Sequence, residues 1–245
     1  ANGILQSACQ SGALDSSLSE AISPIRPSPN ARGISGLMRY GIKTFRDVFS
    51  VRQQFAMKTF CTCILSLREQ MGCEAWADKI SDLLALAIGH LANRNSTLCH
   101  WDTGRETISS TFQRYALRIN WDYSEGNPAH DGSGSFSSAI DWISLALSHL
   151  MLALKGAPTA KVALGSAAEL RDTQDDKVDL VLTDPPYYDA IPYADLSDFF
   201  YVWLRQVIGH KYPIAFHHKL TDKTRELIQH AGKTGGDNVA AKQRY

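Results

Sequence analysis

The stretch VDLVLTDPPYYDAIPYADLSDFFYVWL, residues 178–204, decides how this sequence is interpreted. It opens with a short apolar run, 178–183, which is typical of a strand buried on both faces of a parallel sheet. The run ends in an acid, two prolines and two aromatic residues. Beyond them, apolar residues recur at helical spacing from Leu196 to Val207, so we expect a helix that begins near Asp195 and stops at Gly209.

Apolar periodicity elsewhere predicts a helical region before this stretch. Helices are expected at 47–71, around 80–91 and at 140–154, where apolar side chains recur at helical spacing, and a further helix near 105–115. A second short strand is expected at 161–164, ending at a glycine. The chain is therefore expected to have an α/β fold, in which a helical region precedes part of a sheet.

Composition divides the chain into four segments. Residues 1–36 are rich in Ser, Ala, Gly and Pro and are expected to be loop or linker, 37–157 are mainly helical, and 158–210 carry the strands and the motif. The last segment, 211–245, is basic. From Arg205 to the end there are eight basic against three acidic residues, which predicts either a solvated tail or a segment that contacts phosphate groups.

The overall composition is that of a globular protein with a hydrophobic core. Of its 245 residues, 44% are hydrophobic, and the 25 basic and 25 acidic residues balance, so no global charge indicates nucleic acid. The five cysteines include no pair at CxxC spacing, which argues against disulfides and against a metal site. No signal peptide and no apolar run of membrane-spanning length is visible, so we expect a cytoplasmic protein with buried free thiols and no membrane partner.

The tetrapeptide at 184–187 can present hydrogen-bond acceptors to a flat exocyclic amine. Ligands bind beyond the carboxyl ends of strands in open α/β sheets, where Asp184 is expected to lie. The prolines stiffen the loop and donate no N–H, which leaves the Asp184 carboxylate and the Pro185 carbonyl as two acceptors. Tyr187 offers a face for stacking. Hydrogen bonds to both N–H groups favour a pyramidal amine, whose lone pair can attack a methyl group on a sulfonium.

This motif resembles the catalytic motif of the amino-group DNA methyltransferases, which make N6-methyladenine or N4-methylcytosine. The longer string at 183–204 resembles the large microbial adenine-specific DNA methylases that carry a zinc ribbon and are often found near defence genes. Three further segments are also similar to that family: FSVRQQFAMKTF (49–60), LANRNSTLCHW (91–101) and NWDYSEGNP (120–128). The resemblance spans residue 45 to the C-terminus.

The resemblance implies a Rossmann-like domain that uses S-adenosylmethionine to methylate an adenine flipped out of DNA, with other defence-system proteins as partners. The catalytic residues that it implies are Asp184, Pro185, Pro186 and Tyr187. The base pocket is expected to include Tyr187, Tyr188, Asp189 and Tyr193. For the residues past the motif, an ordinary polar loop is the alternative.

The resemblance also indicates where the cofactor binds. Thr183 and Asp184 are expected beside it. Gly165, Ser166 and Ala167 lie where related enzymes often have Gly-Asp-Ala or Gly-Asn-Ala near the cofactor adenine, and Ser166 departs from that pattern. The glycine-rich loop for the methionine part of the cofactor, and the zinc ribbon, are expected upstream of Ala1. No metal ligands are assigned within this chain.

Two other groups of residues favour structural roles. Asp195 and Asp198 have the spacing of a helix N-cap and N3, like a capping box, and this role is favoured over catalysis. His100 has no companions at metal-ligand spacing, so a hydrogen-bonded structural role is expected for it.

Methyl transfer to adenine N6 in DNA is the predicted function, and several alternatives stay open. Cytosine N4, RNA and a glutamine side-chain amide are alternative acceptors, the last because protein amide methyltransferases use a similar Asn-Pro-Pro-Tyr motif. The aspartate and the string YDAIPYADLSDFF favour DNA. A non-catalytic DNA-binding or scaffold module of a defence system is the alternative from a different class. The ends of the chain and Ser166 also suggest a truncated gene product.

Overall fold

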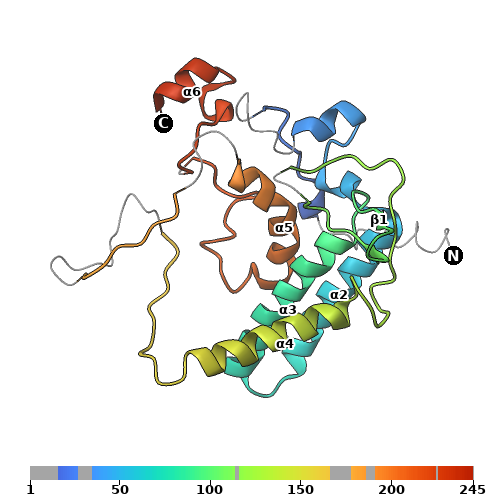
Figure 1. The fold of residues 1–245 in the computed structure, drawn as a ribbon, viewed down its shortest axis with the longest axis vertical. Helices are drawn as coiled ribbons and strands as arrows, with labels where there is room; N and C mark the ends of the chain where they lie inside the picture. The colour runs from blue at the N-terminus through green and yellow to red at the C-terminus, as the bar shows by residue number, and fades with distance from the viewer. Residues whose placement is uncertain are drawn as a thin grey trace.

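The computed structural model describes residues 16–26, 35–113, 116–165, 178–185, 191–224 and 226–244. Helices dominate these ranges, and the strands within them form a two-stranded antiparallel sheet. Figure 1 shows the longer helices packed together, with an arm that follows α4 and runs away from them. The predicted mixture of helices and strands is confirmed at this coarse level.

Two long helices form the centre of the helical region. The predicted helices at 47–71 and 80–91 are confirmed as α2 (Val51–Gln70) and α3 (Glu74–Arg94), which a short connection joins into a packed pair. On the apolar face predicted for α3, Ala87, Ile88 and Leu91 are buried, and the remaining residues, Ile80, Leu83 and Leu84, are partly buried.

The start of α2 is set by a capping box. A short 3₁₀ helix, η3 (Phe45–Val48), occupies the residues where the helix was expected to begin, so α2 starts later. Ser50 then caps α2, because its side chain accepts the Gln53 N–H while the Gln53 side chain accepts the Ser50 N–H.

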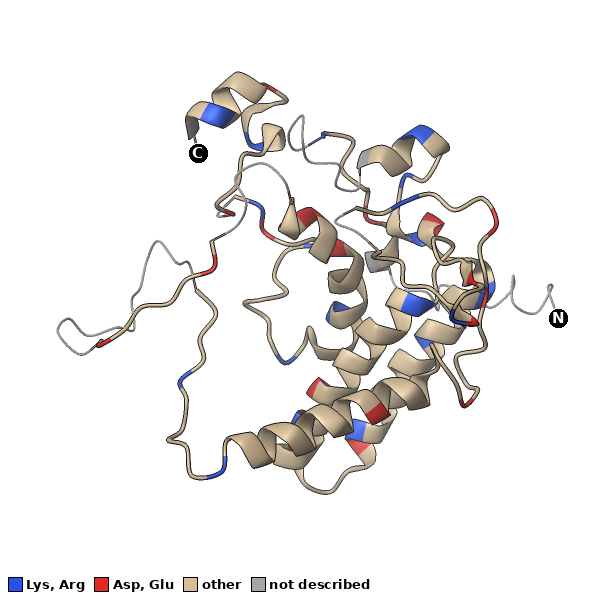
Figure 2. Ribbon diagram, viewed as in Figure 1, with Lys and Arg blue, Asp and Glu red and all other residues tan. Residues whose placement is uncertain are grey.

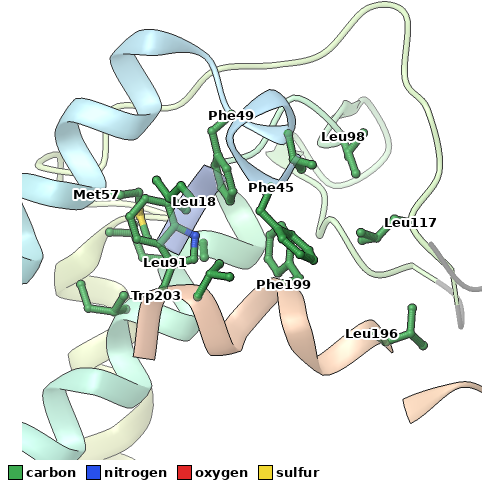
Figure 3. Close-up of a cluster of buried hydrophobic side chains, with 14 of the residues drawn as sticks. Leu18, Phe45, Phe49, Met57, Leu91, Leu98, Leu117, Leu196, Phe199 and Trp203 are labelled. Atoms are coloured by element: carbon green, nitrogen blue, oxygen red, sulfur yellow. The ribbon is translucent and has the colours of Figure 1, made fainter. Parts of the chain in front are cut away.

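The helix after the motif forms the middle of the core. It is confirmed as α5 (Tyr193–Ile208), which packs against α2 and α3. Phe199 and Trp203 on its inner face are fully buried, and both lie against Phe49, with ring centroids 5.4 and 5.2 Å away (Figure 3). The apolar spacing after the motif therefore identified the side that faces the core.

Part of the N-terminal segment also enters the core. Leu18, in the 3₁₀ helix η1 (Ser16–Ser19), and Ile22 are buried; so is Leu37, which begins the next segment and lies in η2 (Ser35–Tyr40). The described residues of this segment are largely irregular, as a loop would be, but these apolar side chains are packed rather than solvated. Isolated apolar residues have no periodicity, which is why the sequence did not predict their burial.

The helix expected at 140–154 is confirmed as α4 (Phe136–Ala153), but most of it is exposed. It packs mainly against α3, and at its start the Phe136 ring stacks on Phe60 of α2 with ring centroids 4.6 Å apart; Ala139 is buried. Figure 2 shows few charged residues along this helix. By length and composition alone α4 could cross a membrane, which corrects the expectation that no apolar run reaches that length.

The two predicted strands are not strands in this structure. Residues 161–164 and 178–183 are extended and exposed, with 85% of Leu182 accessible, and no strand in the described ranges pairs with them. An apolar strand is buried only when neighbouring strands and covering helices are present. The described residues supply no such neighbours.

The helix expected near 105–115 is replaced by a hairpin. Strands β1 (Trp101–Asp102) and β2 (Thr107–Ile108) pair antiparallel, with Trp101 opposite Ile108. Asp102 Oδ1 accepts the N–H groups of Gly104 and Arg105 at 3.0 and 3.2 Å. This Asp turn competes with helix formation, which explains the wrong prediction.

The cysteines and His100 follow their predictions in part. The described cysteines form no disulfide, and Cys61 and Cys99 are buried as expected, whereas Cys63 and Cys73 are exposed. The His100 Nδ1 lies 3.0 Å from the Ser109 hydroxyl and 2.9 Å from the Gln113 amide nitrogen, so its hydrogen-bonded role is confirmed. Among the residues that the structure describes, no cluster of three metal-ligating side chains is found.

The basic C-terminal segment folds back onto α5. It includes the 3₁₀ helix η4 (Ala231–Thr234) and the short helix α6 (Asn238–Arg244). Ile228, Gln229 and His230 are buried just before η4. These residues are therefore not part of a freely solvated tail. Gln229 Nε2 donates to Asn238 O within the segment, whereas His230 lies against Asp195 in the first turn of α5, directly after the motif.

Candidate functional site

The described part of the motif lies on the exposed arm. Thr183, Asp184 and Pro185 are all exposed, and so is Gly165. Among the described residues, no hydrogen bond or ion pair joins Gly165 to Asp184. In the described structure, therefore, Gly165 makes no contact of this kind with the expected catalytic acid.

The other predicted site residues are divided between described and undescribed parts of the chain. Tyr193 is the first residue of α5 and is 46% exposed. The remaining residues lie outside the described ranges: Ser166, Ala167, Pro186, Tyr187, Tyr188 and Asp189. Their predicted roles stay predictions.

The helix that follows the motif begins in a different way from the one predicted. Its N-cap is Pro192, which offers no side-chain hydrogen bond, so Asp195 falls at N3 and the predicted capping box is wrong. The Ala194 N–H in the first turn instead donates to Glu226 Oε1 at 2.9 Å. A carboxylate there also suits the positive end of the helix dipole. A distant segment therefore caps α5.

Asp195 forms a buried pair with His230. Its Oδ2 lies 2.8 Å from His230 Nε2, and the two side chains are 1% and 3% exposed. The other ring nitrogen, Nδ1, accepts the Gly232 N–H at 3.0 Å, so the proton of the neutral ring is on Nε2 and points to Asp195. Both nitrogens of His230 are therefore occupied, which makes the imidazole a crosslink rather than an available base.

Asp198 makes a second buried connection one turn further along. Its carboxylate accepts from the Thr221 N–H at 2.8 Å and from Lys223 Nζ at 2.7 Å. Burial raises the pKa of the Asp198 carboxyl, and the Lys223 charge opposes that rise. The buried charge is retained because it is paired and hydrogen-bonded.

Together these contacts tie the C-terminal segment to the start of α5. Ile191 and Pro192, which lead into the helix, are themselves buried. The cluster, defined as Asp195, Asp198, Lys223, Glu226 and His230, therefore holds the chain in place just beyond the motif. The sequence pattern found the two acids on α5. It did not find their partners, because no local spacing links residues that lie 25 to 35 positions away in the chain.

Replacing His230 by alanine is expected to lower the free energy of unfolding by about 3 kcal/mol, because the buried Asp195 carboxylate would lose its hydrogen bond and keep only the Lys223 ammonium, 3.9 Å away. Urea unfolding at neutral pH measures this loss. His217→Ala, at an exposed histidine, serves as the control and should change stability little. A small loss in His230→Ala, equal to that in the control, would contradict a structural role for the pair.

Glu226 gives the cluster a pH dependence. Burial raises the pKa of its carboxyl, and the Asp195 charge adds to the rise, although the Ala194 hydrogen bond opposes it. Because the folded-state pKa lies above the unfolded value, the folded protein holds this proton more tightly. The resulting stabilisation is complete below the unfolded pKa and is lost as pH rises through the folded pKa.

Glu226→Gln is therefore expected to gain stability relative to the unmodified protein as pH rises from about 4 to about 7. The amide keeps an oxygen for the Ala194 N–H but carries no charge. Urea unfolding at several pH values measures the difference, with Glu69→Gln on the exposed side of α2 as the matched control. The expectation would be refuted if the free energies of unfolding of Glu226→Gln and the unmodified protein differed by the same amount at every pH in this range.

The comparisons with known proteins identify no relative of this chain. No family model, no curated protein and no solved structure matches the chain. Its function therefore has to be argued from its own residues.

Proposed function

We propose that this chain acts as an S-adenosylmethionine-dependent DNA methyltransferase on an exocyclic amino group, adenine N6 in the first instance. The Asp-Pro-Pro-Tyr motif carries the proposal, because its acid follows an apolar run and precedes a strongly patterned helix. The exposure of Asp184 supports it, since no hydrogen bond or ion pair among the described residues occupies the carboxylate. An available acceptor is what an incoming amine requires.

The Rossmann-like fold is part of this proposal. Residues 161–164 and 178–183 would enter a parallel sheet, whose other strands the described residues do not supply. The exposure of Leu180 and Leu182 supports this, because burying such side chains in a sheet is favourable. Asp184 would then lie at the carboxyl end of a strand, where α/β proteins bind their ligands.

The residues of the motif and Gly165 suit the chemistry of both proposed ligands, the exocyclic amine and S-adenosylmethionine. The Asp184 carboxylate and the Pro185 carbonyl can accept the two N–H bonds of the amine, and Tyr187 can stack on its ring. Gly165 has open space around the position where a Cβ would lie, which leaves room beside it for the cofactor adenine. When bound, S-adenosylmethionine supplies an electrophilic methyl group.

In the proposed reaction the amine is the nucleophile. A nitrogen–carbon bond forms as the carbon–sulfur bond breaks, and the proton lost from the methylated nitrogen passes to solvent or through Asp184. The chain contributes the orientation of the amine and the acceptors that favour its pyramidal form. Cytosine N4, RNA or a protein glutamine would use the same acceptors.

One observation favours a second candidate, a non-catalytic DNA-binding or scaffold module. Gly165 and Asp184 are both exposed, and no contact among the described residues joins them. A module of this kind would bind DNA without binding the cofactor. Cofactor binding therefore distinguishes the two candidates.

The identity of the product tests the proposal. The chain, and the longest reading frame that contains it, are incubated with S-adenosylmethionine and unmethylated DNA, and the digested DNA is analysed by mass spectrometry. N6-methyladenine that depends on the cofactor is the expected result. N4-methylcytosine would change the acceptor, and cofactor binding without a methylated base would rule out DNA as the substrate. DNA binding with neither product nor cofactor binding would favour the scaffold module.

A further inference from the structure

A cavity lies where the residues before and after the hairpin meet, and its lining includes no residue of the exposed arm. It has a volume of about 260 Å³ and is lined by residues from 98–100, 111–113 and 118–120. Leu98 and Ile119 supply its apolar surface, and the other lining residues are polar. The volume is below the usual range for a drug-sized ligand, so the cavity suits a small group better than a whole cofactor.

His100 presents a donor of fixed orientation to this cavity. Its Nδ1 receives the Gln113 Nε2–H at 2.9 Å, and an amide nitrogen can only donate, so Nδ1 is an acceptor and the neutral ring carries its proton on Nε2. The Ser109 hydroxyl accepts the His100 backbone N–H at 2.9 Å, which leaves its own proton for the same Nδ1 at 3.0 Å. These two contacts therefore set the tautomer of the ring.

The Nε2–H group of His100 is accessible to a ligand. It forms no hydrogen bond in the described structure, and it is not among the unpartnered atoms that are shut off from solvent. The side chain is partly buried, so the donor is held in place and still reachable.

Arg118 supplies the positive charge of the cavity. Its side chain is exposed and forms no ion pair or hydrogen bond within the part of the chain that the structure describes. None of the described lining residues is acidic, so no carboxylate of the lining competes for the guanidinium. A guanidinium presents its N–H groups as a planar fork that fits two oxygens of one anion. The cavity therefore offers several N–H donors and a positive charge to an anion.

The cavity lies beside the half of α5 that follows the motif. Phe112, between two lining residues, has its ring centroid 5.3 Å from that of Phe199 and 5.2 Å from that of Phe200. In Figure 3, Leu98 of the lining lies toward the Leu196 end of α5. An anion held here would therefore lie on the side of the core where α5 begins.

We propose that this cavity binds a phosphate group through Arg118 and the His100 Nε2–H. Arg118 would bind two of its oxygens, and His100 would donate to a third. The favoured source is the DNA backbone, because the cavity is small, carries one positive charge and lies near the start of α5, where a single phosphate beside a bound base would be. The choice of DNA rests on the proposed function, whereas the phosphate site itself does not.

Binding of inorganic phosphate tests the site without DNA or cofactor. The chain is titrated with phosphate at neutral pH, and the ring signals of His100, assigned by their loss in His100→Asn, are followed by NMR. A saturable shift is expected. Arg118→Gln should weaken phosphate binding by about tenfold, because a charged hydrogen-bonding group is lost. Acetate should bind more weakly than phosphate, since it has no third oxygen for His100, and equal affinity would overturn the choice of phosphate.

Binding of a labelled DNA duplex, followed by fluorescence anisotropy at several salt concentrations, tests the source. Arg118→Gln is expected to lower the affinity and to reduce the slope of log affinity against log salt by about one, because one phosphate contact is lost. His100→Asn keeps an acceptor near the position of Nδ1 but removes the Nε2–H, so it should also weaken binding. Lys155→Gln removes an exposed positive charge just beyond α4 and should bind as the unmodified chain does.

The outcomes separate the site from its ligand. No saturable shift with phosphate, or equal phosphate affinities in Arg118→Gln and the unmodified chain, would overturn the site. Phosphate binding that depends on Arg118, together with a DNA affinity that does not, would overturn DNA as the source in favour of a free phosphate compound. Neither measurement uses S-adenosylmethionine, so a failure here is distinct from a failure of methyl transfer.

Discussion

Replacing Asp184 by alanine is expected to reduce methyl transfer at least about 100-fold, the scale seen when one preorganised hydrogen-bonding group is removed from an active site. The free energy of unfolding should change by less than about 0.5 kcal/mol, because the side chain is exposed and makes no hydrogen bond or ion pair in the described structure. Product mass spectrometry and urea unfolding measure the two quantities.

The exposed arm offers a matched control for this experiment. Asp179 is an exposed acid on the same extended segment, so Asp179→Ala removes an equal charge nearby. It should retain activity. Equal losses of activity in Asp179→Ala and Asp184→Ala would show that activity depends on negative charge on the arm, and not on a hydrogen-bond acceptor at position 184. Full activity in Asp184→Ala would remove the proposed role of the carboxylate.

The predictions from the sequence were most accurate for helices that bury one apolar face. The apolar spacing of α3 and α5 identified their inner faces, because a helix that is buried on one side places its apolar residues at a fixed interval. On α4 the same spacing was present, yet most of its apolar side chains are exposed. Periodicity shows which face can be buried, but it does not supply the surface that covers it.

The prediction of strands failed for a related reason. A run such as 178–183 has the composition of a buried strand, but its hydrogen bonds must come from neighbouring strands. The described residues provide none, so the run is extended and exposed. Helices α2 and α3 form their hydrogen bonds internally, and for that reason local sequence was sufficient to predict them.

Only those residues of the candidate site that lie close together in the sequence could be predicted. The motif and the two acids on α5 were recognised from composition and spacing. His230 and Glu226 were not, because their contacts with Asp195 and Ala194 depend on a return of the chain that no local pattern records.

Trp203→Ala is expected to lower the free energy of unfolding by about 3–5 kcal/mol, the range for truncating a fully buried aromatic residue. Trp203 is 0% exposed, and its ring packs edge-on against Phe49 with centroids 5.2 Å apart (Figure 3). It lies on α5, where that helix meets α2 and α3. A cavity at this point would weaken the packing of α5 against α2 and α3, which urea unfolding would report as a lower midpoint.

Two further tryptophan variants separate burial from side-chain chemistry. Trp142 on α4 is 67% exposed, so Trp142→Ala should change stability by less than about 1 kcal/mol. Trp203→Phe should lose much less than the alanine variant, because the Trp203 indole N–H has no acceptor in the described structure and a ring would still fill most of the space. Equal losses in Trp203→Ala and Trp142→Ala would contradict the placement of α5 at the centre of the core.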